Sequence, residues 1–469
     1  MHRAKIGRRT FLARGLAASG LLILADGRSA SSYQANQKLN VAIVGAGGRG
    51  KWFVDTVPKM ENVVALCDVN EKRAAESYQK LPKAAKHQDF RKMLDQMRHQ
   101  IDAVIVAAPD HVHAPACACA MKAGKHVFCE KPLTHSVLEA RALRELAIKH
   151  KVATQMGNQG MSSGDFRRSA ELIQAGALGA VQEVHVWNSG GGPGRREAPK
   201  ETPPVPQGLN WDLWLGPAPY RPYHPAWLAW SGWRDFGTGQ LGLWASHTAS
   251  LAFYALKLPS LWLGEGPVQE RAVRVEAEVS ELETLSFPRW EVVRYDLPAR
   301  GDMPPVKVHW YNGNPPGKRK LLEGILERPL DWGDAGQRKW RDWAGCLIVG
   351  QHGKIYANGH NATCSLLPAE KFKDFLRPDE KTKALAGPKP WLLPSHGPER
   401  DWFAACRGGP QGLSNFAEFS GPFLEFLLLG NVATQVRASL EFDPAGGKVL
   451  NHSQADALLG REYRKGWSL

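Results

Sequence analysis

The segment 45–50, Gly-Ala-Gly-Gly-Arg-Gly, has glycine at three positions that a phosphate-binding turn requires. An apolar run over 39–44 precedes it and is typical of a buried strand, and a helical pattern follows it through Trp52. A second apolar run ends at Asp68, eighteen residues after Gly50. Glycines and a carboxylate at this spacing in a strand–turn–helix unit predict a dinucleotide site.

The glycines of this motif have separate roles. Gly45 permits the tight turn, Gly47 leaves room for a pyrophosphate to touch the backbone, and Gly50 lets the helix pack close to the strand. Gly48 and Arg49 lie at the helix N-terminus, where free N–H groups and the helix dipole favour an anion. These five residues are therefore candidate nucleotide contacts.

Asp68 decides which nucleotide is expected. Its carboxylate can accept hydrogen bonds from a ribose 2′-hydroxyl and would repel a 2′-phosphate, so we expect NAD, with NADP disfavoured. Lys72 and Arg73 are the nearest basic side chains that could offset this preference.

The bulk composition limits the remaining possibilities. A chain of 469 residues predicts two domains. With 43% hydrophobic and 23% charged residues it is neither disordered nor a membrane bundle. The net charge of +14 is partly carried by a basic leader, and no Lys/Arg run interleaved with aromatic residues predicts nucleic-acid binding. The seven cysteines include no CxxC pair, so we expect neither a disulfide framework nor a metal site.

Residues 1–38 are interpreted as a leader. Arg8 and Arg9 stand directly before a short, mildly apolar segment that ends near Ala25, which resembles a twin-arginine export signal. The segment is too short to span a bilayer, and no later segment is long enough, so we expect no stable membrane insertion. The predicted location is periplasmic or exported.

Two domains are expected after the leader. Over 39–157, strand patterns alternate with helix patterns, which predicts βαβ units and a doubly wound parallel sheet, the α/β Rossmann architecture. The helix after the third long strand is expected at 114–123. Over 158–469 the pattern is α+β with an open, mostly antiparallel sheet, surface loops at 313–340 and 376–398, and C-terminal helices near 399–406 and 422–437.

Five segments together carry a family resemblance: GAGGRG, AAPDHVHAP (107–115), CEKPLTHSVLEA (129–140), GNQG (157–160) and the segment around His247. They resemble the glucose-fructose oxidoreductase, inositol dehydrogenase and rhizopine-catabolism (Gfo/Idh/MocA) family, and the C-terminal REYRKGWSL resembles exported, planctomycete-type members. The resemblance implies a Rossmann domain joined to an open-faced α/β domain, a homo-oligomer (dimer or tetramer), and oxidation or reduction of a small carbohydrate or cyclitol with tightly held nucleotide.

The resemblance also implies roles for individual residues. Glu130 and Lys131 would lie at the nicotinamide edge, where burial and a neighbouring positive charge lower a lysine pKa and suit it to proton transfer. Pro109 and His113 would form a turn over the nucleotide, with Asp110 and His111 facing solvent. In the GNQG segment, Asn158 is a candidate nucleotide contact.

One departure from the family pattern concerns catalysis. Relatives are expected to have Asp-x-x-x-His on one helix face, and here His247 occupies the histidine position while Leu243 occupies the aspartate position. His247 is therefore a catalytic candidate beside Lys131, with a structural role as the alternative. Asp235 and His224 are nearby residues that could replace the missing carboxylate.

Tryptophans gather on the expected substrate side. The cluster predicts a carbohydrate-facing cleft in which Arg195, Arg234 and Asn158 hold hydroxyls, with core or interface packing as the alternative. The tryptophans concerned are Trp187, Trp211, Trp214, Trp227, Trp230, Trp233 and Trp244.

Three functions fit these patterns. The first is an exported NAD-dependent oxidoreductase acting on a sugar, cyclitol or glycoside. The second is an NAD-dependent, redox-neutral glycoside hydrolase of the same superfamily, and the third is a nucleotide-bearing, non-catalytic binding protein, for which Leu243 is the main argument. The fold by itself does not decide between them.

Overall fold

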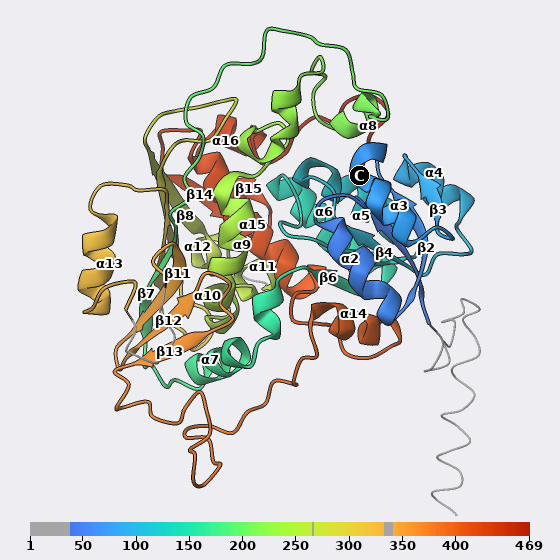
Figure 1. Cartoon of the computed structure of the whole chain (residues 1–469). Coiled ribbons are helices and arrows are strands. Elements are labelled where there is room, and N and C mark those ends of the chain that lie inside the picture. The colour runs from blue at the N-terminus through green and yellow to red at the C-terminus, as the bar shows by residue number, and fades with distance from the viewer. Residues whose placement is uncertain (1–37, 265–266, 333–340) are drawn as a thin grey trace, which may run out of the picture. The chain divides into compact units, whose positions relative to one another are not determined.

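Two β-sheets organise the chain in the computed structural model, which describes residues 38–264, 267–332 and 341–469 (Figure 1). The predicted leader, with Arg8 and Arg9, lies outside the described residues. Residues 39–469 form one compact unit that contains both sheets.

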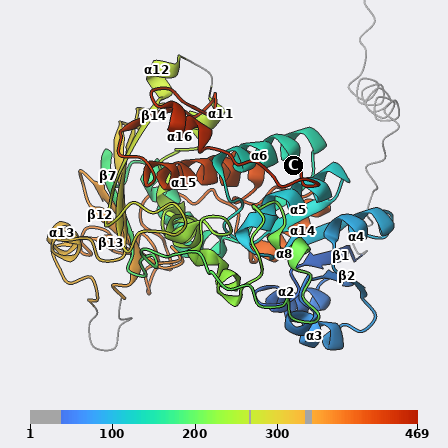
Figure 2. The ribbon, with the colours of Figure 1, turned by 90° about the horizontal axis from the view of Figure 1, so that it is seen from above.

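The first sheet has six strands in the order β3-β2-β1-β4-β5-β6, and every neighbouring pair is parallel. Its strands are apolar because helices cover both faces (Figure 2). The strand order reverses beside β1, which opens a ligand crevice at the carboxyl ends of the strands. The predicted doubly wound sheet is confirmed. Its elements are β1 (Asn40–Val44), α2 (Gly50–Thr56), β2 (Asn62–Cys67), α3 (Glu71–Lys80), β3 (Ala85–His87), α4 (Phe90–Gln96), β4 (Ala103–Val106), α5 (Asp110–Lys122), β5 (His126–Cys129), α6 (Val137–His150) and β6 (Thr154–Met156).

The second sheet has nine strands in the order β13-β12-β11-β7-β10-β9-β8-β14-β15. Only the pairing of β7 with β10 is parallel, so the predicted mostly antiparallel sheet is confirmed. Its strands are β7 (Val181–Asn188), β8 (Val273–Val279), β9 (Glu291–Leu297), β10 (Val306–Asn312), β11 (Ala344–Gly350), β12 (Lys354–Asn358), β13 (Cys364–Leu367), β14 (Leu440–Asp443) and β15 (Lys448–Val449).

Helices fill the space between the two sheets. The most buried is α15 (Gly421–Ala433), which packs against α6 on one side and β8 on the other (Figures 1 and 2). The remaining helices are α7 (Gly164–Gln174), α8 (Trp211–Leu215), α9 (Ser246–Thr248), α10 (Ser250–Ala255), α11 (Ser260–Leu263), α12 (Val268–Arg271), α13 (Lys318–Leu326), α14 (Pro398–Cys406) and α16 (Ser453–Ala457), with π-helical turns at Leu241–Ala245 and Phe416–Ser420 and short 3₁₀ turns at Val57–Lys59, Gln159–Ser162, Pro225–Leu228 and Trp230–Gly232.

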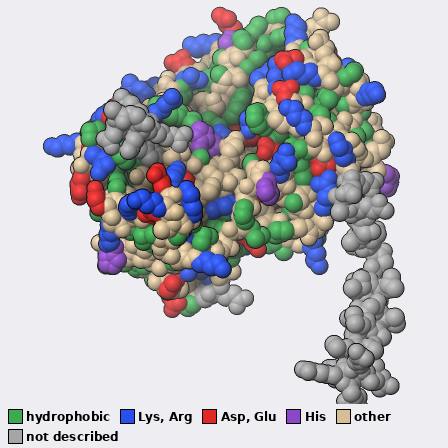
Figure 3. All heavy atoms as spheres, turned by 60° about the horizontal axis from the view of Figure 1, so that its bottom comes forward, with side chains coloured by type: hydrophobic (Ala, Val, Ile, Leu, Met, Phe, Trp, Pro, Cys, Tyr) green, Lys and Arg blue, Asp and Glu red, His purple; other side chains and the backbone are tan. Residues whose placement is uncertain are grey.

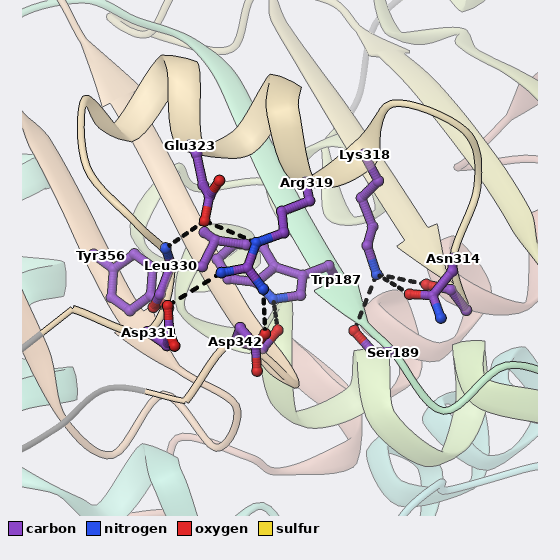
Figure 4. Close-up of polar contacts among 11 residues, drawn as sticks. Trp187, Ser189, Asn314, Lys318, Arg319, Glu323, Leu330, Asp331, Asp342 and Tyr356 are labelled. Atoms are coloured by element: carbon purple, nitrogen blue, oxygen red, sulfur yellow. Dashed lines mark hydrogen bonds and ion pairs between the residues drawn. The ribbon is translucent and has the colours of Figure 1, made fainter.

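Helix α13 corrects the prediction of a loop over 313–340. Leu322 and Leu326, one turn apart, are buried against Trp187 on the outer face of the second sheet. Arg319 donates from its guanidinium to Glu323, Asp331 and Asp342, and Lys318 donates to Ser189 (Figure 4). The apolar pair was hidden in the sequence by the Lys, Gly and Pro residues around it.

The surface is mixed in charge. Figure 3 shows Lys and Arg side chains interspersed with Asp and Glu on the face that it presents. None of the helices within the described ranges has the length and apolar composition needed to cross a bilayer.

Candidate nucleotide and substrate site

One cavity of about 490 Å³ lies at the carboxyl ends of β1, β2, β4 and β5, the crevice that the strand order predicts. Its volume is in the range of small-molecule pockets. Ten predicted site residues line it: Gly45, Gly47, Gly48, Arg49, Asp68, Pro109, His113, Glu130, Lys131 and His247. Two predicted site residues, Gly50 and Asn158, are not among the lining residues.

The glycine turn leaves no room for side chains. Gly45 has φ +85°, and a Cβ there would stand 2.7 Å from the backbone of Ala107. A Cβ on Gly50 would stand 1.8 Å from the carbonyl oxygen of Gly45, so Gly50 brings helix α2 against the strand. A Cβ on Gly47 would stand 2.9 Å from the Cβ of Arg73. The turn is a backbone cradle at a helix N-terminus, which fits a pyrophosphate.

Asp68 connects this turn to β2. One carboxylate oxygen accepts a hydrogen bond from the Gly47 N–H at 2.8 Å, and the other accepts one from the Asn70 N–H at 2.8 Å. Burial raises the pKa of Asp68, while these two N–H groups oppose the rise. The carboxylate is thereby fixed at the cavity wall, where the ribose of a dinucleotide requires it.

His113 holds two walls of the cavity together. It is buried in the first turn of α5, and its ring nitrogens lie 2.7 Å from the carbonyl oxygens of Pro132 and Ala108. Burial lowers its pKa. We interpret His113 as a residue that positions the turns after β4 and β5.

The prediction that Asp110 and His111 face solvent is wrong. Helix α5 begins at Asp110, four residues earlier than expected, so its first turn points inward. Asp110 lines the cavity and accepts a hydrogen bond from Thr238 Oγ1 at 2.6 Å, and burial raises the pKa of Asp110 to about 7. His111 is buried, with Nε2 lying 2.8 Å from the Trp214 carbonyl oxygen.

The Glu130–Lys131–Pro132 turn forms the end of the cavity opposite Asp68. The Lys131–Pro132 peptide bond is cis. Glu130 pairs with the Arg49 guanidinium at 2.7 Å. Lys131 Nζ donates to the carbonyl oxygen of Leu243 at 3.0 Å. Burial lowers the pKa of Lys131, while the carboxylates of Glu130 and Asp110 oppose this change. The Leu243 carbonyl oxygen thus fixes the position of the amine, which loses its proton more easily than an exposed lysine does.

His247 faces the same end of the cavity. It is buried in α9, its ring centre lies 4.7 Å from that of His360, and within the described part of the chain its Nδ1 has no hydrogen-bond partner. Burial and the nearby Lys131 hold the pKa of His247 well below its usual range, so the ring is neutral at neutral pH. The Leu243 carbonyl that accepts the hydrogen bond from Lys131 belongs to a π-helical turn, a distortion that is frequent at functional sites.

Neither proposed substitute for the missing carboxylate lies at the cavity. Asp235 pairs with Arg221 at 2.8 Å, and His224 accepts the Ala226 N–H at 3.1 Å as a helix cap. Both are absent from the cavity lining. That hypothesis is therefore wrong, because local partners already use both side chains.

Sequence reasoning missed His360 and undervalued Asp110. His360 lies between β12 and β13 and lines the cavity beside His247 and Trp244. Burial lowers its pKa. No motif surrounds His360, and only the fold brings it to His247 from a distant part of the chain. For Asp110, the available signal was its own carboxylate, because acidic residues are favoured in the first turn of a helix.

Asn158 lies beside the site without lining it. Its Nδ2 donates to the Ser246 carbonyl oxygen at 2.9 Å, which fixes the start of α9. Of the other residues predicted to hold hydroxyls, Arg195 is largely exposed, and Arg234 donates to the carbonyl oxygens of Glu283 and Ser286. None of these three side chains lines the cavity.

Only part of the tryptophan cluster lies at the cavity. Trp214, Trp230 and Trp244 line the cavity. Four others are buried in cores: Trp187 under α13, and Trp211, Trp227 and Trp233 in an aromatic cluster over 209–236. Composition could not separate these roles, since stacking on a ligand and stacking on a neighbour need the same side chain.

A six-stranded doubly wound sheet with a glycine cradle and an anchored Asp68 defines the class of Rossmann-fold nucleotide-binding proteins. The model of the GFO_IDH_MocA oxidoreductase family, with its NAD-binding Rossmann fold, matches residues 39–158, and the model of the family's C-terminal alpha/beta domain matches 172–295. Together these matches span about half of the chain. The protein belongs to the Gfo/Idh/MocA family.

Individual relatives are more distant. The levoglucosan dehydrogenase of Pseudarthrobacter phenanthrenivorans is 29% identical over 161 residues, which cover 31% of this chain and 39% of that protein. The myo-inositol 2-dehydrogenase of Thermotoga maritima is 24% identical over 150 residues, which cover 32% and 44%. The chain thus spans less than half the length of these relatives.

Solved structures extend the likeness in fold to most of the chain. The WlbA dehydrogenase from Bordetella pertussis superposes with a TM-score of 0.55 at 14% identity, covering 86% of this chain and 97% of that one. A levoglucosan dehydrogenase, in complex with NADH and L-sorbose, superposes with a TM-score of 0.53 at 16% identity, covering 86% and 99%. At these identities the likeness shows the fold alone.

Proposed function

We propose that the protein is an NAD-dependent oxidoreductase that acts on a hydroxyl-bearing carbon of a sugar or cyclitol. The observation that carries the proposal is Lys131, a half-buried amine with a lowered pKa, placed at the end of the cavity opposite Asp68. An amine in that place can take a hydroxyl proton while the carbon loses hydride. The names of the relatives, levoglucosan and inositol dehydrogenases, agree with this substrate class.

The residues of this chain fit NAD rather than NADP. The cradle at Gly45 and Gly47 suits the pyrophosphate, and Asp68 lies where it would repel a 2′-phosphate. Arg73 reaches the turn, with a guanidinium nitrogen 2.9 Å from the position of a Cβ on Gly48. If the protein binds NADP, Arg73 is therefore the basic residue expected to contact the 2′-phosphate.

NAD, when bound, supplies the hydride acceptor, and the protein supplies proton transfer and shape. The Leu243 carbonyl holds Lys131 Nζ in one place. Burial lowers the pKa of this amine, and the carboxylates of Glu130 and Asp110 limit how far it falls. In its free-amine form, Lys131 accepts the substrate hydroxyl proton. Aromatic walls from Trp214, Trp230 and Trp244 suit the C–H faces of a sugar and exclude water.

Redox-neutral glycoside cleavage is a second candidate. The observation in its favour is that His247 and His360, both with lowered pKa values, lie together beside Lys131. Elimination from a transiently oxidised sugar needs a proton to leave a ring carbon and another to reach the leaving oxygen. Three neighbouring groups that can move protons suit such a sequence.

We also propose that the protein is exported and that it forms a homo-oligomer. The twin-arginine leader supports export of the folded protein, and the family resemblance supports a homo-oligomer. Replacing Arg8 and Arg9 with Lys is expected to stop export without changing nucleotide binding.

The test uses the purified protein with its own nucleotide. Denaturation should release NAD or NADH, and a panel of free sugars, cyclitols and aryl glycosides should include one that changes the nicotinamide absorbance. Cleavage of glycosides without net NADH, with exchange of a ring hydrogen for solvent deuterium, would favour the hydrolase. Bound nucleotide without a response to any sugar or glycoside would favour a binding protein.

A further inference from the structure

The last nine residues, 461–469, form an extended segment that crosses the first domain, and we name it the C-terminal strap. It lies outside the family-model matches, which end at residue 295. Its indole, Trp467, lines the cavity together with Phe90 and Asp89.

Hydrogen bonds and ion pairs anchor the first four residues of the strap, 461–464. Arg461 and the Tyr463 hydroxyl both donate to one oxygen of the buried Glu139 carboxylate, at 3.0 and 2.7 Å. Arg464 pairs with Asp212 and donates to the Gly216 carbonyl oxygen at 3.2 Å. A partnered, buried carboxylate at one anchor indicates a fixed course rather than a loose tail.

The second half of the strap places Trp467 against the wall beyond β3. The Arg91 guanidinium lies 4.2 Å from the centre of the Trp467 ring, and Arg91 also donates to the Gly466 carbonyl oxygen at 2.9 Å. Asp89 accepts two bonds from the same guanidinium, which keeps Arg91 in position. The ring centre of Phe90 lies 5.9 Å from that of Trp467.

The strand order identifies this wall as the adenosine end. The phosphate cradle follows β1, Asp68 follows β2, and Gln88 to Phe90 follow β3, whereas Lys131 follows β5 on the other side. Because the acidic residue after β2 binds the adenosine ribose, the space beyond it toward β3 takes the adenine.

A second remote segment lines the same end of the cavity and is hydrogen-bonded to the strap. Glu71 donates its N–H to the Gly208 carbonyl oxygen, and Asn210 donates its N–H to that of Val69, which holds the segment 208–218 on the turn after β2. Leu213 and Trp214 of this segment line the cavity. The N–H of Arg464 in turn bonds to Pro217, so the strap secures the segment.

We propose that the C-terminal strap is a clasp for the adenosine half of NAD, in which Trp467 covers the adenine ring. The proposal rests on the proposed function, since it assumes that the cavity binds NAD. Nucleotide release requires the strap to lift, so exchange with solution is slow.

The test measures ligand release rather than turnover. Protein loaded with NADH is chased with excess ADP-ribose, and the nicotinamide fluorescence gives the dissociation rate. W467A should release NADH about tenfold faster, the effect of removing one base-stacking aromatic side chain. W467F should restore slow release. The matched control is W391A, because Trp391 is 49% exposed and does not line the cavity.

Reduced nicotinamide mononucleotide separates a clasp from a general packing role, since it lacks the adenosine half. Its affinity should be equal in W467A and the unaltered protein, whereas that of ADP-ribose should fall in W467A. If W467A does not fold, R464Q, which frees the strap outside the cavity, should also speed NADH release. Unchanged NADH release in both variants, or equal weakening of both probes, would overturn the clasp. Failure of the unaltered protein to bind NADH would instead overturn the proposed function.

Discussion

The two ends of the cavity are built on opposite principles. At the adenosine end, polar groups are already satisfied: Asp68 accepts two backbone N–H groups, and Asp89 holds Arg91. At the nicotinamide end, burial lowers the pKa values of Lys131 and His247, and Nδ1 of His247 has no hydrogen-bond partner among the described residues. The difference agrees with our proposal that one end binds the nucleotide and the other carries out the chemistry.

The largest effect on the binding end is expected from G45A. The new Cβ would stand 2.7 Å from the Ala107 backbone at φ +85°, so strain and overlap add, and we expect a loss of about 3 to 5 kcal/mol in the free energy of unfolding. NADH binding should be lost as well. Chemical denaturation and NADH titration measure both.

G124A is the matched control for G45A. Gly124 also has positive φ, at +74°, but none of the described residues has an atom within 4 Å of its Cβ position. It should lose only about 1 to 2 kcal/mol and bind NADH normally. Equal behaviour of the two variants would show that the cradle is not close-packed.

A smaller effect is expected from D68A. Loss of the charged acceptor should weaken NADH binding about tenfold or more, as hydrogen bonds to charged groups contribute, and should leave NADPH binding unchanged or tighter. Isothermal titration with both nucleotides gives the ratio. A preference for NADPH in the unaltered protein would refute the assignment of Asp68.

The smallest change is expected from D110N, at the nicotinamide end. The Asp110 carboxylate raises the pKa of Lys131, so its removal lowers that pKa, and the rising limb of oxidation rate against pH should move to lower pH. Because the pKa of Asp110 is about 7, its charge acts above that pH, where the two profiles should differ. Asparagine keeps an acceptor for Thr238. A limb that stays in place, or moves to higher pH, would contradict the coupling.

Local patterns predicted most of the fold. The glycine turn, the carboxylate after β2 and the alternating strands and helices each depend on residues close in sequence, and these predictions agree with the structure. Helix α13 was missed because its apolar face consists of a few leucines within a polar, glycine-rich stretch.

The nicotinamide end was less predictable, for a physical reason. Lys131 follows from its motif, but its neighbours arrive from distant segments: the Leu243 carbonyl from a π-helical turn and His360 from a β-turn. Burial also changes what a residue type means, as Asp110 and the packed tryptophans show. No spacing in the sequence encodes such long-range contacts.

The central claim is that Lys131 moves the proton, and single-turnover reduction of bound NAD by a responding sugar tests it most directly. K131A should slow reduction at least ~10²-fold while nucleotide content stays the same. K131R, which keeps the positive charge but cannot give up its proton, should be similarly slow. Reduction by K131A at a rate near that of the unaltered protein would contradict the account.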